Sequence, residues 1–150
     1  MLRFKEVNAP GKRTRKINPK LGYLGFLGFT GFLGIWSYNN FDKVIFPFLF
    51  FGFFGFFGFF FEGKMSNTYI DERYEQNEKR ARLNAYQTGA RLIWLLLVTI
   101  GVGTIPIEAI AIIVVTSLSF ICALTTFLSQ YLLYRYDREE SNIGNSEENS

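Results

Sequence analysis

The sequence of 150 residues contains no histidine and a single cysteine, Cys122. These absences exclude a disulfide framework within the chain, a zinc-finger-type site, a histidine-based catalytic triad and a histidine-ligated metal or haem. We therefore expect a protein that is not an enzyme, needs no cofactor and binds no metal. What the chain does contain is 49% hydrophobic residues, with 18 phenylalanines and 14 glycines, a composition that argues against an ordinary soluble domain.

Four long apolar segments predict an all-α membrane protein with four transmembrane helices. The spans lie at about residues 21–38, 44–61, 84–103 and 107–134. As α-helices the first two would each measure ~27 Å, slightly less than the ~30 Å hydrocarbon core, so we expect them to stand nearly upright. The last span, at ~42 Å, should tilt or project. Inside lipid only helices or a closed barrel satisfy the backbone, and these segments lack the alternation of barrel strands.

The basic residues predict the orientation. Of the 16 lysines and arginines, only Lys43 lies in the loop between the first two spans, and none lies in the turn between the last two. The positive-inside rule then places both termini in the cytoplasm. We divide the chain into a basic cytoplasmic segment (1–20), a transmembrane domain (21–136) with a cytoplasmic helical loop (62–83), and an acidic, disordered tail (137–150).

Glycine recurs at every third position in the first two spans. The positions are Gly22, Gly25, Gly28, Gly31 and Gly34 in the first and Gly52, Gly55 and Gly58 in the second. Because a three-residue step falls ~60° short of an α-helical turn, this spacing predicts a groove that winds around each helix. Small residues let membrane helices approach closely, so we interpret the glycines as the contact between the first two helices, with phenylalanines facing lipid and other helices.

Two other interpretations of the glycines stay open. Such weakly helix-forming segments can flex or adopt 3₁₀ character and gate a passage, or the repeat is a low-complexity expansion without a specific role. The four-residue spacing of the well-attested membrane dimer motif is absent, so the pattern does not by itself predict a homodimer.

The segment after the second span opens like a helix. Thr68 and Asp71 form a candidate capping box, and the third helix should begin near Tyr69 and project into the cytoplasm. Its charged start is either a solvated helix end or a docking surface for a partner protein or a second copy. The candidate docking residues are Asp71, Glu72, Arg73 and Tyr74.

A basic tract precedes the first span and is expected to bind anionic lipid headgroups at about 1 kcal/mol per basic residue. Its residues are Lys12, Arg13, Arg15, Lys16 and Lys20. Membrane topology alone also explains such a tract. Because no nucleic-acid-binding fold or interleaved aromatic residues accompany the charge, we expect no nucleic-acid partner.

Residues 18–86 resemble a catalogued family of small bacterial membrane proteins of unknown function. The matching pieces are NPKLGYLGFLGFTGFLG, FFGFFGFFGFFFEGKMSNT and IDERYEQNEKRARLNAY. The ordered series over residues 61–68, followed by residues 71–74, is more specific than the Phe/Gly repeats. The resemblance implies a multi-pass protein of the bacterial plasma membrane, often seen in small operons with helix-turn-helix regulators, and it supplies no catalytic residue.

Together these features predict a non-enzymatic accessory, sensing or immunity-type membrane protein that acts through a cytoplasmic partner. The alternative is a small transporter or channel subunit acting as a homo-oligomer, because four short helices with few polar intramembrane residues make a poor pore alone. The expected partners are the lipid bilayer and either another protein or further copies of the chain.

Overall fold

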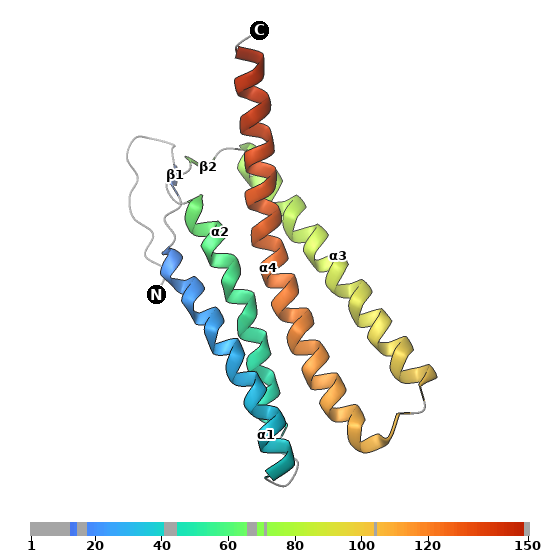
Figure 1. The fold of residues 1–150 in the computed structure, drawn as a ribbon. Helices are drawn as coiled ribbons and strands as arrows, with labels where there is room; N and C mark the ends of the chain where they lie inside the picture. Colours follow the sequence, from blue (N-terminus) through green and yellow to red (C-terminus); the bar gives the residue numbers. More distant parts are fainter. Residues whose placement is uncertain are drawn as a thin grey trace.

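The computed structural model describes residues 13–14, 18–40, 45–65, 69–70, 72–103 and 105–148. Apart from one two-residue antiparallel pair, β1 (Arg13–Thr14) with β2 (Tyr69–Ile70), these residues build helices. In chain order the helices are η1 (Pro19–Phe32), α1 (Leu33–Asn40), η2 (Phe46–Gly58), α2 (Phe59–Lys64), α3 (Glu72–Val102) and α4 (Ile107–Glu148) (Figure 1). The all-α fold class is confirmed, and η1 continues into α1 and η2 into α2, so there are four rods.

The first two rods are 3₁₀ helices over most of their length. η1 has 14 residues and η2 has 13, whereas 3₁₀ runs beyond ~3–4 residues are uncommon. Each starts with a proline in its first turn, and Asn18 Oδ1 accepts a hydrogen bond from the Lys20 amide at 3.0 Å. With three residues per turn, every third residue lies in a straight row. The predicted winding groove, which assumed an α-helix, is therefore wrong.

The 3₁₀ geometry also lengthens these rods. At ~2.0 Å rise per residue, η1 and η2 alone measure ~28 Å and ~26 Å. With the α-helical turns that follow, both rods exceed the ~30 Å hydrocarbon core. The span length of ~27 Å, calculated with the α-helical rise, is corrected accordingly.

The four rods stand in a single row. The η1–α1 rod packs on the η2–α2 rod, which packs on α4, and α4 packs on α3 (Figure 1). Among the described residues, the first rod does not pack on α3 or α4, and α3 does not pack on the first two rods. In the most apolar window of α3, and likewise of α4, only 11% of the residues are buried within the protein. A row one helix thick leaves these faces to lipid.

Three of the rods are long and apolar enough to cross a membrane: Phe46–Lys64, Glu72–Val102 and Ala109–Glu139. Their most apolar windows have mean hydropathies of 1.5, 1.3 and 2.3. The first rod, predicted to span at residues 21–38, is not in this set. Beside its five glycines it carries polar residues, namely Thr30, Ser37, Asn39 and Asn40, which lower its mean hydropathy.

Two predicted boundaries are corrected. Helix α3 begins at Glu72 and not near Tyr69, because Tyr69 pairs with Thr14 in the short β1–β2 ladder; Thr68 and Asp71 lie outside the described residues. The predicted disordered tail is helical as far as Glu148. Extending a formed helix costs much less than nucleating one. The i, i+4 pair of Arg135 and Glu139, at 2.7 Å, supports α4 where the tail begins. No proline follows in the sequence to end the helix.

Helix α3 is fixed to α4 near the end of the molecule that holds the start of η1. Buried residues form a stripe along α3, namely Tyr74, Asn77, Ala81, Ala85 and Gly89. At the top of this stripe Tyr74 and Ala81 join Met65 and Leu133 in a hydrophobic cluster. Asn84 Nδ2 donates to Tyr136 Oη at 2.8 Å, which adds a polar contact between the two helices.

The row arrangement predicts a long distance between the first rod and α3. Spin labels at Leu27→Cys and Ala90→Cys, in a Cys122→Ser background, should lie three helix spacings apart, or ~24–30 Å between backbones. Double electron–electron resonance in lipid measures this distance. The control pair, Ala90→Cys with Leu124→Cys on adjacent helices, should be ~8–10 Å apart, so equal distances for the two pairs would contradict the row.

Candidate functional site: the glycine–phenylalanine interface

Every glycine of the first rod lies against a phenylalanine ring of the second. The pairs are Gly22–Phe60, Gly25–Phe57, Gly28–Phe54, Gly31–Phe51 and Gly34–Phe48. A Cβ atom added at any of these glycines would lie 2.5–2.9 Å from the nearest ring carbon, which is far inside van der Waals contact. The two rods are antiparallel, so each three-residue step forward in the first matches one backward in the second. Glycine is thus required here by the lack of space for a side chain.

Beside the glycines, aromatic rings stack along both rods. Tyr23, Phe26, Phe29 and Phe32 follow one another at 6.3–6.4 Å, and Phe51, Phe54, Phe57 and Phe60 at 6.1–6.2 Å. Three residues of a 3₁₀ helix rise ~6 Å, which is this spacing. The helix type, the glycine repeat and the ring spacing are therefore geometrically matched.

The two rows of rings also contact each other edge to face. Tyr23 meets Phe60 at 5.3 Å, Phe29 meets Phe54 at 5.1 Å, and the intervening and following pairs are at 5.2 and 5.1 Å. T-shaped pairs contribute ~0.5–1.5 kcal/mol each beyond the area they bury. We call the five glycine–phenylalanine pairs, together with these four T-shaped pairs, the Gly–Phe ladder.

The glycines of the second rod face a different partner. Gly52 lies 3.9 Å from the Ser119 carbonyl oxygen and Gly55 lies 3.0 Å from the Ala123 carbonyl oxygen, measured from an added Cβ. Gly58 lies against the amide oxygen of Gln130. The sequence interpretation placed these three glycines against the first helix, but they contact α4. A 3₁₀ helix presents three straight rows. In η2 the glycine row packs on α4, and the row of Phe51, Phe54 and Phe57 packs on the first rod, while Phe51 and Phe54 also stack on Phe120 of α4.

Polar groups are few along the described spans. Two buried oxygens, Thr116 Oγ1 and Gln130 Oε1, have no hydrogen-bond partner. Several other hydroxyl groups bond within their own helix, such as Thr125 Oγ1 to the Ile121 carbonyl at 2.7 Å. Because Gln130 Oε1 rests on Gly58, a weak Cα–H···O contact is the interaction available to it. In the described part of the chain no group of three His, Cys, Asp or Glu side chains is placed to hold a metal.

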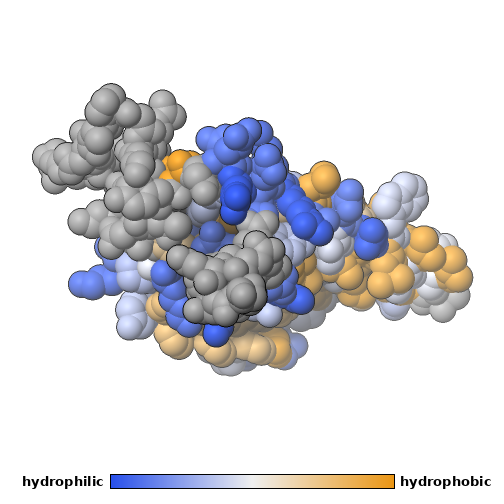
Figure 2. Space-filling model, turned by 90° about the horizontal axis from the view of Figure 1, so that it is seen from above, coloured by the Kyte–Doolittle hydropathy of each residue, from blue (hydrophilic) through white to orange (hydrophobic). Residues whose placement is uncertain are grey.

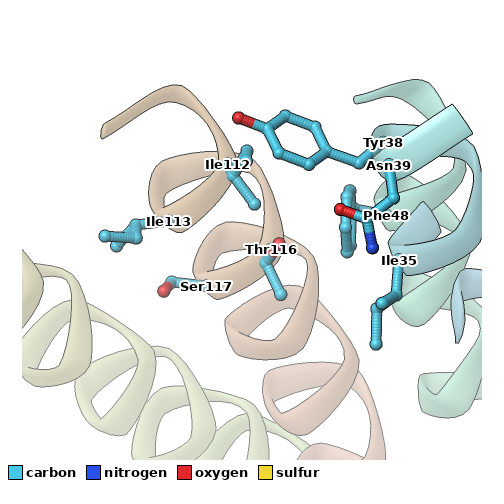
Figure 3. A pocket seen from close by; sticks show the side chains of 8 residues that line it. All are labelled: Ile35, Tyr38, Asn39, Phe48, Ile112, Ile113, Thr116 and Ser117. Carbon is cyan, nitrogen blue, oxygen red and sulfur yellow. The ribbon is translucent and has the colours of Figure 1, made fainter. Parts of the chain in front are cut away.

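A hollow of about 440 Å³ opens between the end of α1 and the first turns of α4 (Figure 3). Its lining residues are Ile35, Tyr38, Asn39, Phe48, Ile112, Ile113, Thr116 and Ser117. Figure 3 shows Ile113 and Ser117 on the side of α4 that is turned away from Ile35 and Phe48, so the hollow is open and shallow. Its lining holds no carboxylate, lysine or arginine, and its polar groups are the hydroxyls of Tyr38, Thr116 and Ser117 and the amide of Asn39.

The predicted docking residues have unequal exposure. Glu72 and Arg73 are exposed at the start of α3, whereas Tyr74 is only 5% exposed and belongs to the cluster with Met65 and Leu133. Tyr74 is therefore part of the packing and does not line a free surface. Asp71 lies outside the described residues.

Of the predicted headgroup residues, Lys20 is exposed in the first turn of η1. Arg13 forms β1 and is paired with Ile70 through the backbone. Lys12, Arg15 and Lys16 lie outside the described residues. Sequence reasoning missed Phe120, whose ring stacks on Phe51 at 4.6 Å, because a single phenylalanine among the aliphatic residues of an apolar helix carries no positional signal.

Residues 16–138 match the model of a family described as "Predicted membrane protein (DUF2178)". The matched range includes the whole Gly–Phe ladder and all of α3. No curated protein and no solved structure matches the chain.

The ladder predicts opposite effects for two glycine substitutions. Gly28→Ala places a methyl group 2.5 Å from Phe54, whose ring is held between Phe51 and Phe57, and should destabilise the protein by about 1–3 kcal/mol. Gly52→Ala has 3.9 Å of space and should be neutral or stabilising, since alanine is the better helix former. Unfolding free energies in bicelles measure both effects.

A second variant tests whether the cost of Gly28→Ala comes from overlap with the Phe54 ring or from the loss of backbone flexibility at residue 28. Combining Gly28→Ala with Phe54→Leu should cost less than the sum of the two single changes, because a smaller side chain relieves the overlap. Additive costs would show that Gly28 and Phe54 do not share a contact.

Proposed function

Since the chain belongs to this family of predicted membrane proteins, we propose that it is a multi-pass protein of the bacterial plasma membrane that acts without catalysis, by presenting the start of α3 to a cytoplasmic protein. This is an accessory, sensing or immunity-type role. The observation that carries it is the two-sided construction of α3, which is buried along one stripe and charged on the opposite face.

Four crossings with cytoplasmic termini fit the packing. The Gly–Phe ladder extends from Gly22–Phe60 to Gly34–Phe48, so the first rod follows an apolar spanning rod along nearly its full length. The start of η1, the end of α2, the start of α3 and the last half of α4 lie at one end (Figure 1). That end is rich in lysine and arginine, which favours the cytoplasmic side. Figure 2, viewed from above, shows hydrophilic residues gathered there.

The first turns of α3 form a rigid charged surface. The buried stripe and the hydrogen bond from Asn84 to Tyr136 hold the helix against α4. The exposed residues of these turns are Glu72, Arg73, Glu75, Gln76, Lys79, Arg80 and Arg82. Of these, Arg80 also lies over the Tyr136 ring of α4, at 5.0 Å from the ring centre. A surface with both signs of charge favours a partner protein of complementary pattern, whereas a surface made only for anionic lipid would be uniformly basic.

The alternative, a transporter or channel subunit, requires several copies. A row one helix thick encloses no passage, and the described spans place few polar groups where a solute could be coordinated. Flux of ions or solutes through liposomes that contain only this protein would favour the alternative, and the proposed role predicts none.

Photocrosslinking tests the docking surface. A photoreactive residue at the exposed Gln76 should capture one discrete protein in bacterial cells, because the α3 surface is held rigidly in the cytoplasm. The matched control is the same residue at Trp94, which is 70% exposed within the spanning part of α3 and should give lipid adducts only. Capture of lipid and random neighbours at both positions would refute the docking role. Arg73→Glu combined with Lys79→Glu, both exposed on this surface, should abolish the discrete product.

A further inference from the structure

A second hollow, about 340 Å³ in volume, lies on the C-terminal half of α4. Its lining residues are Tyr131, Tyr134, Arg135, Arg138 and Glu139. Beside it, Lys64 at the end of α2 holds its Nζ atom 5.7 Å from the centre of the Tyr134 ring and 5.8 Å from that of Phe61. We call these residues, with Phe61, the cationic end cluster.

The cationic end cluster lies where two spanning rods end together. Lys64 is the last residue of the Phe46–Lys64 span and Glu139 is the last of the Ala109–Glu139 span. On the membrane side the cluster is aromatic, with Phe61 at 5.4 Å from Tyr131 and 5.6 Å from Tyr134. Tyrosine rings prefer the depth of lipid headgroups. Moving toward the end of α4, the surface changes from rings to guanidinium groups within two turns.

The cluster brings several cations together. Arg135, Arg138 and one carboxylate, Glu139, line the hollow, and Lys64 lies beside it over the Tyr134 ring. Arg138 also has an interaction of its own within the chain, and its guanidinium carries five N–H donors. Arg135 donates to Glu139 through Nε at 2.7 Å, so that bond does not use its terminal nitrogens. The Arg135 side chain is 58% exposed. A guanidinium has five N–H donors in a fork that matches two phosphate oxygens at once, and the ammonium of Lys64 adds a further charge.

We propose that the cationic end cluster binds the phosphate of one anionic phospholipid, from the leaflet at this end of the spans. Arg135 and Arg138 hold the phosphate oxygens, Lys64 balances the charge, and the rings of Phe61 and Tyr131 lie against the glycerol and upper acyl chain. This site differs from the basic tract before the first span, because rings and cations from two rods are combined in one place. It goes beyond the proposed docking role and does not depend on it.

Native mass spectrometry of the full chain in detergent tests the site. The probes are phosphatidylglycerol, phosphatidylcholine and inorganic phosphate, each titrated alone. Arg135→Gln combined with Arg138→Gln should raise the dissociation constant of the most tightly bound phosphatidylglycerol by about tenfold or more. The control, Lys79→Gln combined with Arg82→Gln, removes as many cations from the same end but outside the hollow, and should change that affinity less than about twofold.

Three results would overturn the proposal. They are an equal loss in the control variant, equally tight binding of phosphatidylcholine, and displacement of the lipid by inorganic phosphate at the same concentration, which would indicate a site for free phosphate. Thermal unfolding of each variant checks the fold. The single variants Arg135→Gln and Arg138→Gln, each expected to weaken binding several-fold, keep the test decisive if the double variant unfolds.

Discussion

The absence of a Cβ atom at every third residue of the first rod is the constraint on which the rest of the structure depends. Each of those glycines gives a phenylalanine ring access to the backbone, at distances where a methyl group would overlap the ring. In the three central pairs, from Gly25 to Gly31, both partners lie in 3₁₀ helices, where three residues per turn keep the contact in a straight line. The lack of space for a side chain at the glycines therefore favours an uncommon helix type, over 14 residues in η1 and 13 in η2. The ring spacing of about 6 Å follows from the rise of that helix.

The three straight rows of a 3₁₀ helix also explain why the molecule is a row and not a bundle. In η2 the row with Phe51, Phe54 and Phe57 faces the first rod, and the glycine row faces α4. These two rows lie on different sides of η2, so its two neighbours are held apart, and among the described residues the first rod does not pack on α4. Phe120 fits this plan, since it stacks on Phe51 from the α4 side.

The sequence predicts the helical class and the apolar segments because both depend on composition and length alone. It also shows the glycine repeat, but not the partner of each glycine, because the same period places residues in a winding groove on an α-helix and in a straight row on a 3₁₀ helix. The burial of Tyr74 depends on Leu133, which is distant in sequence, and on Met65, which lies before the turn into α3. For the same reason the cationic end cluster, built from Lys64 and Arg135, has no local signal in either segment.

Such a ladder is more stable in lipid than in water. Each glycine costs ~1 kcal/mol relative to alanine in a helix interior, and 3₁₀ hydrogen bonds are poorer than those of an α-helix. In water, exposed backbone groups could exchange these bonds for bonds to solvent, and a rod with five such glycines would fray. In hydrocarbon an unsatisfied backbone group costs several kcal/mol, so the segment stays helical. The relevant difference in free energy is then the one between the α-helix and the 3₁₀ helix. Ring-to-backbone packing, repeated from Gly25 to Gly31, then favours the helix with three residues per turn.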